Sequence, residues 1–238
     1  MRLLFLCHKL NFYQFLLNFF RVYGRIKVKR RKEGVSMAYI AAILVGYLLG
    51  CSNMALYLSK AKGVDLRAGG SGNLGASNAT ALLGWKAGVL TALHDGAKAF
   101  IPALICRFLF PDVAHLAVVA GVAAVCGHMF PFYLGFKAGK GLASYVGMLV
   151  ALNLKFAVAV FILLVIITFV TDFIVMGTTA TMIVTPVFFG ITQGWIPAVV
   201  LGTLSLVIIY KHRMNYVHIA DGTEGRLSKA IRGEYRVK

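Results

Sequence analysis

Long apolar stretches separated by short polar loops run through most of the chain. Three of them, 38–58, 85–110 and 114–132, approach or exceed the roughly 20 residues that a helix needs to cross a bilayer. The segment 142–210 has room for four more passes, with polar breaks near 153–155, 171–172 or Gly177, and 193–194. This pattern predicts an all-α, polytopic integral membrane helical bundle with about seven transmembrane helices, and five as the conservative count.

Composition supports a membrane protein. Apolar residues make up 59% of the chain, charged residues only 14%, and the mean hydropathy is +0.79, which excludes an ordinary soluble domain. The net charge of +17 is typical of nucleic-acid binding in a soluble protein. Here nearly half of it lies in residues 1–36, and no basic soluble domain with interleaved aromatic residues follows, so nucleic acid is not an expected partner.

Residues 1–36 form a basic, amphipathic N-terminal extension with nine Lys or Arg side chains and one acid. Its apolar part is interrupted too often to cross a membrane unaided. One interpretation is an anchor that lies on an anionic lipid surface. The other, which we favour, is that translation starts at Met37, because a clean apolar span begins directly after it.

The positive residues of the remaining chain predict its orientation. Lys and Arg gather in the loop after the first span, in the loop at 135–141, and from Lys211 into a basic tail at 229–238. With an odd number of spans, all three lie on the cytoplasmic side of a cell (inner) membrane. The membrane-embedded domain is expected at 37–228. The four cysteines form no CxxC pair or Cys/His cluster, so we expect neither a metal site nor a disulfide framework.

Two glycine-rich loops are candidates for binding anions. The first, 67–78, combines Arg67 with glycines, serines and asparagines, and glycines allow successive backbone N–H groups to point at one ligand. The second, 127–141, carries Lys137 and Lys140 beside glycines before a helix. It lacks the GxxxxGK[ST] spacing of a nucleotide-binding loop, but it suits a phosphate group. Composition alone leaves a flexible connection or a membrane-face anchor as the alternative for each loop.

Ionisable residues near or within the spans form two further groups. Asp95 and Lys98 are three residues apart in an apolar stretch, where each unpaired charge costs roughly 2.5–3.5 kcal/mol, so we expect both to face the protein interior. His212 and Asn215 follow the last span and share a face if its helix continues. Arg213, taken alone, is typical of a topology anchor.

Together these motifs resemble one family. The order and spacing of GSGNLGASN, HDGAK, GHMFPFYLGFKAGKG and KHRMNYVHIADGTEGRLS between Ala38 and Ser228 are similar to the bacterial membrane acyltransferase family called PlsY. The resemblance implies transfer of a fatty acyl group from acyl phosphate to the first hydroxyl of glycerol 3-phosphate, giving lysophosphatidic acid. It also implies a seven-helix fold and partners limited to these two substrates and membrane lipid, with no cofactor, metal or acyl carrier protein.

The resemblance also distributes roles among residues. Expected catalytic residues are Ser71, His212 and Asn215. Expected substrate- and phosphate-binding residues are Arg67, Asn73, Asn78, Lys137, Gly139, Lys140, Gly141, Ser144 and Arg213. Expected structural residues are Asp95, Lys98 and Glu224. His212 is either a general base or a substrate binder, with a substrate phosphate oxygen accepting the proton in the second case.

Two positions depart from the family pattern. Ala81 stands where members usually carry Arg, and Ala138 replaces the first Gly of a Gly-Gly pair. These departures leave open a divergent paralogue with another acceptor. The alternative from another class is a small anion-binding membrane transporter, although no matching half-sequences are present. The HxxxxD pattern of other glycerolipid acyltransferases is absent, since no histidine has Asp five residues on.

Overall fold

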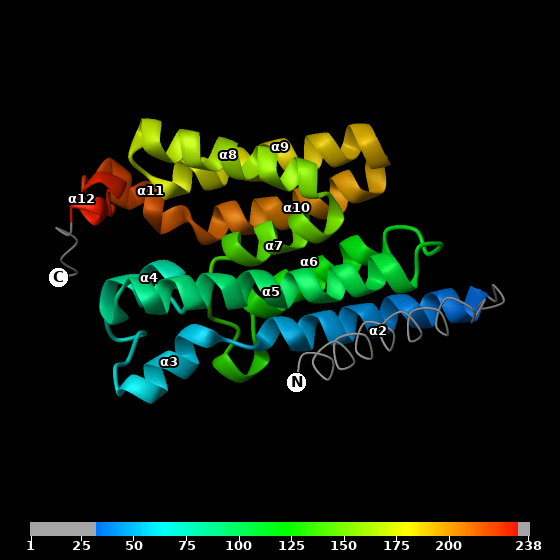
Figure 1. Cartoon of the computed structure of the whole chain (residues 1–238), viewed down its shortest axis with the longest axis horizontal. Coiled ribbons are helices and arrows are strands. Elements are labelled where there is room, and N and C mark those ends of the chain that lie inside the picture. The colour runs from blue at the N-terminus through cyan, green and yellow to red at the C-terminus, as the bar shows by residue number, and fades with distance from the viewer. Residues whose placement is uncertain (1–31, 233–238) are drawn as a thin grey trace, which may run out of the picture.

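The structure is a computed structural model, and it describes residues 32–232. The elements in chain order are α2 (Lys32–Cys51), α3 (Met54–Lys62), α4 (Ala76–Leu83), α5 (Trp85–Leu109), α6 (Leu116–Met129), the 3-10 turn η1 (Phe132–Leu134), α7 (Leu142–Leu152), α8 (Leu154–Thr171), α9 (Ile174–Gln193), α10 (Trp195–Lys211), α11 (Arg213–Ala220) and α12 (Leu227–Ile231). The described chain is entirely helical between its loops, which confirms the predicted class (Figure 1). Residues 1–31 of the N-terminal extension and residues 233–238 of the tail lie outside the described residues.

The helices account for the predicted spans. Within residues 32–232, five helical segments are long and apolar enough to cross a membrane, which matches the conservative count. A sixth is the pair α10 and α11, bent by 44°, and α7 is a shorter apolar helix of 11 residues. The expected breaks are confirmed at Asn153, at Asp172 and at Gly194. Asn153 marks its break physically, because its side-chain oxygen accepts from Phe156 N and caps α8.

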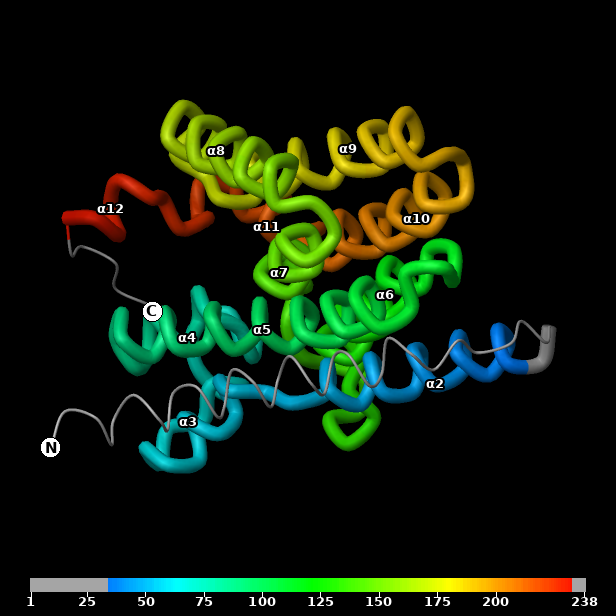
Figure 2. Tube along the Cα trace, turned by 45° about the vertical axis from the view of Figure 1, so that its right-hand side comes forward, coloured from blue at the N-terminus to red at the C-terminus, as the bar shows by residue number. Residues whose placement is uncertain are grey.

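The bundle has two groups of helices with α7 between them. Helices α2 to α6 lie together, α8, α9 and α10 pack as a second group, and α7 contacts α5, α6 and α8 (Figures 1 and 2). The shorter helices α3, α4, α11 and α12 gather at one end of the molecule. Both glycine-rich loops and the region after the last long helix therefore lie at the same end.

The buried core runs through α7 and its neighbours. The hydroxyl groups of Tyr145 and Ser205 lie 3.0 Å apart and join α7 to α10, and both residues are buried. Arg107 closes the far end of α7 by donating to the carbonyl oxygens of Ala151, at 2.6 Å, and Leu152, at 3.1 Å. Because unpaired helix-terminal carbonyls are costly away from water, this contact allows α7 to end inside the bundle.

The C-terminal segment is tied to the turn between α8 and α9. The Asp172 carboxylate accepts from Ser228 N at 2.7 Å and from Ser228 Oγ at 2.6 Å, and these bonds hold the pKa of Asp172 below its usual value. Leu227 N donates to the Asp172 carbonyl at 2.9 Å. Arg226 lies over the Phe173 ring. The segment from α11 to α12 is therefore held at both ends, by its continuity with α10 and by this turn.

Glycines allow α2 and α6 to pack closely. A Cβ atom on Gly50 would lie 2.0 Å from the Ala124 carbonyl oxygen, and one on Gly46 would lie 2.5 Å from the Ala120 carbonyl oxygen. From the other side, a Cβ atom on Gly127 would lie 2.1 Å from the Tyr47 carbonyl oxygen. These two helices thus meet backbone to backbone, as small residues allow in membrane proteins.

We expect Gly50→Ala to destabilise the protein by roughly 1–3 kcal/mol, because the methyl group would overlap the α6 backbone. The thermal midpoint of the purified protein in detergent measures this effect. The matched control is Gly202→Ala on α10, where a Cβ atom would lie 3.7 Å from Pro186 Cβ, an ordinary contact. Equal midpoints for the two variants would contradict the close approach of α2 and α6.

Candidate active site

A buried pair of opposite charges lies beneath the glycine-rich loops. Lys98 Nζ is 2.8 Å from Asp95 Oδ1 on α5, and the two residues are 6% and 2% exposed. His128 Nδ1 of α6 lies 3.3 Å from the same carboxylate oxygen. This geometry confirms that Asp95 and Lys98 face the interior, where burial of a charge requires a partner.

The pair also connects to the break between α2 and α3. Lys98 Nζ donates to the Ser52 carbonyl oxygen at 2.6 Å, and Ser52 Oγ lies 3.0 Å from His94 Nε2. On the other side of α5, Ser144 Oγ donates to the Asp95 carbonyl oxygen at 2.8 Å. One cluster of polar groups thus fixes α2, α5, α6 and α7 relative to one another.

Two asparagines organise the first loop. Asn78 is buried, and its amide nitrogen donates to the carbonyl oxygens of Leu66, at 2.7 Å, and Gly69, at 3.3 Å. Its amide oxygen accepts from Ser71 N at 3.0 Å. Asn53 caps α3 through Leu56 N and donates to the Leu74 carbonyl. The loop is therefore ordered by its own side chains, and the Ser71 side chain is exposed at its surface.

The second loop packs directly on the first. The Ala138 side chain is buried in an apolar cluster with Leu74 of the first loop, with Leu66 directly before that loop, and with Ala55 and Ala79. The methyl group that replaces the family's usual glycine therefore fills this cluster. Gly141 at the end of the loop has a φ of +104°, which favours glycine, and α7 begins directly after it.

The third group is brought in by a bend. The chain turns by 44° between α10 and α11, at His212, so the last span does not continue straight to Asn215, which was the condition for a shared helical face. The bend places Asn215 against the second loop, where Lys140 Nζ donates to its amide oxygen at 2.5 Å. Asn215 in turn donates to Glu224 Oε1 at 2.6 Å, and His218 Nδ1 lies 3.6 Å from Glu224 Oε2.

Lys140 is the cation at the junction of the second and third groups. Burial lowers the pKa of its ammonium group, and the negative charge of Glu224 acts in the opposite direction. Lys140 and Lys211 also lie within electrostatic range of His212. Positive charge thus accumulates where the second loop meets the bend.

His212 is oriented by a single backbone contact. Its Nδ1 atom lies 2.8 Å from the Ile208 carbonyl oxygen, which can only accept a hydrogen bond. Nδ1 therefore carries the hydrogen, and in the neutral ring Nε2 keeps its lone pair. The ring can accept a proton only at Nε2.

Five of the predicted site residues, the expected catalytic Ser71 and four expected binding residues, fall into two sets. Arg67, Ser71 and Lys137 are exposed, and their side chains make no hydrogen bond or ion pair with other residues of the described range 32–232. Asn78 and Ser144, by contrast, are buried and use their polar side-chain atoms on the backbone. These hydrogen bonds give both side chains a part in the scaffold, and their contact with substrate stays a prediction.

The other predicted residues are placed as follows. Asn73 is half-buried, and its amide nitrogen would lie 2.9 Å from a Cβ atom added to Gly75. Arg213 is exposed and lies over the Tyr210 ring, 4.5 Å from its centroid. Ala81, where the family's arginine is expected, is half-buried on α4.

Three residues make contacts that support the site although the sequence did not predict them as site residues. Lys211 donates to the Met129 carbonyl at 3.1 Å and lies over the Phe130 ring. His128 completes the buried charge cluster. Asp172 holds the segment after Glu224. The signal for His128 was available, because an ionisable residue within an apolar span needs a buried partner and Asp95 is the acidic residue of that region.

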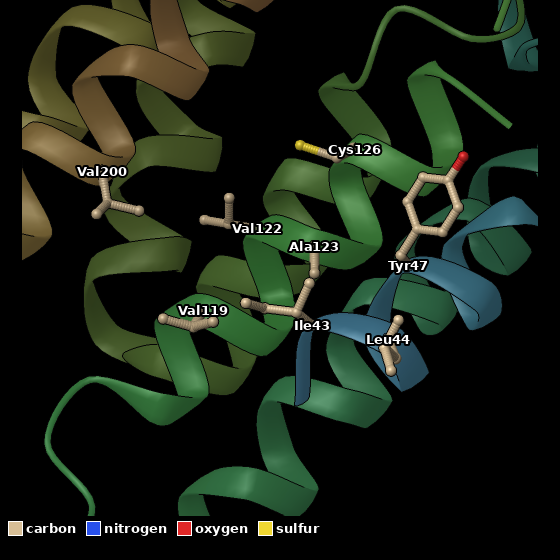
Figure 3. A pocket seen from close by; sticks show the side chains of 8 residues that line it. All are labelled: Ile43, Leu44, Tyr47, Val119, Val122, Ala123, Cys126 and Val200. Carbon is tan, nitrogen blue, oxygen red and sulfur yellow. The ribbon is translucent and has the colours of Figure 1, made fainter. Parts of the chain in front are cut away.

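An apolar groove lies between α2, α6 and α10. Its volume is about 490 Å³, and it is lined by Ile43, Leu44, Tyr47, Val119, Val122, Ala123, Cys126 and Val200 (Figure 3). Tyr47 Oη donates to the Phe130 carbonyl at 2.7 Å, and Lys211 lies over the Phe130 ring. The groove therefore has a positive charge near the end that is closest to His212.

The fold and the site define a multi-pass membrane protein whose ionisable groups and glycine-rich loops gather at one end of the bundle. Residues 40–222 match the family model described as glycerol-3-phosphate acyltransferase. The chain belongs to this acyltransferase family.

Individual relatives agree with this assignment. The chain is 34% identical over 203 residues to glycerol-3-phosphate acyltransferase 1 of Oceanobacillus iheyensis, with 81% of this chain and 96% of the relative covered. It is 37% identical over 195 residues to the glycerol-3-phosphate acyltransferase of Aquifex aeolicus, with 80% and 100% covered.

Solved structures are also similar. The crystal structure of PlsY, an integral membrane glycerol 3-phosphate acyltransferase, in its glycerol 3-phosphate form matches with a TM-score of 0.75 and 33% identity, covering 81% of this chain and 96% of that one. Its lysophosphatidic acid form matches with a TM-score of 0.72 and 33% identity, covering 79% and 94%.

We expect Glu224→Gln to shift the alkaline limit of acyltransferase activity to lower pH. The substitution keeps an acceptor for Asn215 but removes the negative charge that raises the pKa of Lys140, so Lys140 loses its proton at lower pH. Initial rates measured across the pH range test this.

Asn215→Leu is the companion variant. It removes both hydrogen bonds of the Lys140–Asn215–Glu224 chain and is expected to lower activity by about tenfold or more, since a hydrogen bond to a charged group contributes about 1.5–3 kcal/mol.

Identical pH profiles for Glu224→Gln and the unmodified protein would show that Glu224 does not support the Lys140 charge.

Proposed function

We propose that the chain transfers a fatty acyl group from acyl phosphate to the sn-1 hydroxyl of glycerol 3-phosphate, giving lysophosphatidic acid without acyl carrier protein. The observation that carries the proposal is the contact of Lys140 with Asn215, which joins a Gly/Lys loop suited to phosphate to the bend that carries His212. The names of the relatives, and the glycerol 3-phosphate and lysophosphatidic acid forms of PlsY, support the acceptor and the product.

Two phosphorylated substrates require two anion-binding regions. The second loop offers Lys137, Lys140 and the backbone around Gly139 and Gly141, and the first loop offers Arg67 with Ser71 and Asn73. Ala138 packs the two loops on each other, so both regions are held at one end of the bundle. Holding both reactants on a fixed scaffold replaces an encounter in solution and lowers the entropic part of the barrier.

The reaction exchanges one acyl C–O bond for another and moves one proton. The acceptor hydroxyl oxygen attacks the acyl carbonyl carbon, the bond from that carbon to the phosphate oxygen breaks, and inorganic phosphate leaves. The hydroxyl proton goes either to His212 Nε2, which has its lone pair free, or to a phosphate oxygen of the substrate. Lys140, Lys137 and the Ser71 hydroxyl stabilise charge on the phosphate and the carbonyl oxygen.

The acyl chain is proposed to lie in the apolar groove of Figure 3. Val200 and Lys211 are 11 residues apart on the same face of α10, which corresponds to about 16 Å along the helix and is of the order of an extended acyl chain. Lys211 near Phe130 places a positive charge at one end of this path. The groove thus offers apolar contact for the chain and a cation toward the acyl phosphate.

The site is proposed to face the cytoplasm from the inner membrane. The positive residues Lys60, Lys62, Lys137 and Lys211 belong to segments that meet at the site end of the bundle (Figure 1). Cytoplasmic loops carry such an excess of Lys and Arg.

The direct experiment supplies the purified full chain with acyl phosphate and glycerol 3-phosphate and measures lysophosphatidic acid. Acyl carrier protein loaded with the same acyl group, and other hydroxylated phosphate acceptors, serve as comparisons. Product from acyl phosphate and glycerol 3-phosphate supports the proposal. Product from another donor or acceptor alone would reassign the substrate, in line with Ala81 at the position of the family's arginine.

His212→Gln separates the two routes of the proton. If His212 Nε2 is the base, the turnover number falls by about a hundredfold or more while the Michaelis constants change little. If a substrate phosphate oxygen takes the proton, the variant changes mainly the Michaelis constants. Steady-state kinetics with each substrate varied in turn distinguish these results.

Val200→Phe is expected to shift the chain-length preference. A phenyl ring in the groove leaves room for a short acyl chain but obstructs a long one, so the ratio of kcat/KM for long over short acyl phosphates should fall about tenfold. Val199→Phe is the matched control, because Val199 is exposed on α10 and does not line the groove. An equal ratio in both variants would place the acyl chain elsewhere.

A further inference from the structure

His128 is a buried ionisable residue without a part in the proposed reaction. Its side chain is 3% exposed in α6, and its Nδ1 atom faces Asp95 Oδ1 at 3.3 Å. The opposite edge of the ring, with Cε1 and Nε2, faces the second glycine-rich loop. The imidazole therefore lies between the buried charge pair and the loop that carries Lys140.

The loop backbone rests on this ring at Gly139. A Cβ atom built on Gly139 would lie 1.9 Å from His128 Nε2 and 2.3 Å from His128 Cε1, far inside contact distance. Any side chain at this position would require either the ring or the loop to move. Gly139 is followed directly by Lys140, so a displacement at Gly139 is transmitted to the ammonium group that contacts Asn215.

The ring lies against a well-connected part of the scaffold. Asp95, which faces the ring, is fixed through its side chain by Lys98 at 2.8 Å and through its carbonyl by Ser144 at 2.8 Å. Lys98 is fixed in turn by the Ser52 carbonyl at 2.6 Å. A close-packed interior of this kind leaves the ring little freedom to yield.

We propose that His128 is a positioning residue for phosphate binding: its imidazole, oriented by Asp95 and Lys98, is the surface against which Gly139 is seated, and it thereby sets the place of Lys140 and the loop backbone. Gly139 is required because only a bare Cα can approach the ring this closely. The inference rests on the proposed function in assigning phosphate to this loop.

A double-mutant cycle tests the proposal. Gly139→Ala adds a methyl group that pushes the loop off the ring, and we expect the KM for the phosphorylated substrates to rise about a hundredfold. His128→Asn keeps a polar atom toward Asp95 but removes Cε1 and Nε2, and we expect a rise of about tenfold because the loop loses its support. In the double variant the methyl group has room, so KM should recover at least about tenfold from that of Gly139→Ala.

The proteins of this cycle are also compared by their affinity for inorganic phosphate. Bound phosphate raises the thermal midpoint, and the phosphate concentration that gives half of the full increase measures the affinity. This readout does not need acyl transfer. If the unmodified protein binds phosphate but makes no lysophosphatidic acid, the proposed reaction is contradicted. The effect of His128 on phosphate affinity can still be measured in that case. Recovery of phosphate affinity in the double variant supports the role of His128.

Two results would overturn the inference. One is a double variant as impaired as Gly139→Ala or worse in both readouts. The other is a His128→Asn protein with a lowered thermal midpoint but unchanged KM and phosphate affinity, which would leave the ring a packing residue only. Gly96→Ala is the matched control: a Cβ atom beside Asp95 on α5 would lie 3.6 Å from the Ala143 carbonyl oxygen, and no change in KM is expected.

Discussion

The ion pair between Asp95 and Lys98 is the interaction on which the arrangement of the site depends. Removing one partner of a buried pair leaves an uncompensated charge and typically costs about 3–5 kcal/mol. The pair is also more than a contact between two side chains of one helix. Through Ser52 it reaches the break after α2, and through His128 and Ser144 it reaches α6 and α7. The segments that lead into both glycine-rich loops are fixed from this one point.

The opposite wall of the site is held in another way. The chain after α10 bends at His212, contacts the second loop through Asn215, and is then fastened to the turn between α8 and α9 by Asp172 and Ser228. Glu224 lies between these two attachments and closes the chain of hydrogen bonds that begins at Lys140. The second group of helices thus contributes to the site through a short segment fixed at both ends.

The sequence predicts those features that depend on local pattern. The spans, their breaks at Asn153 and Gly194, and the inward position of Asp95 follow from hydropathy and from the cost of charge in an apolar medium. The bend at His212 and the scaffolding role of Asn78 do not follow. The bend brings Asn215 to Lys140, 75 residues away, and such a pairing has no signal in the spacing of either motif. Polar residues in a loop also look the same whether they serve the backbone or a ligand.

Hydrogen bonds to backbone carbonyls distinguish the side chains that support the scaffold from those that are left for a ligand. Away from water every helix-terminal carbonyl needs a donor, and in this protein long polar side chains from neighbouring elements supply it. Lys98, Tyr133 and Lys211 donate to the carbonyls of Ser52, Cys51 and Met129, which end α2 and α6. Tyr133 has its one hydroxyl hydrogen engaged in this way, and Lys98 divides its ammonium hydrogens between Ser52 and Asp95, whereas Lys211 keeps further N–H donors.

What remains at the surface of the site is a smaller set. Arg67, Ser71 and Lys137 are exposed and make no side-chain hydrogen bond or ion pair within residues 32–232, and His212 keeps its Nε2 lone pair. Lys140 is held by a neutral amide, so its charge is oriented without being neutralised by direct contact. A site for phosphate in an apolar bundle requires this division, because the groups that bind the ligand must be positioned by others that already have their partners.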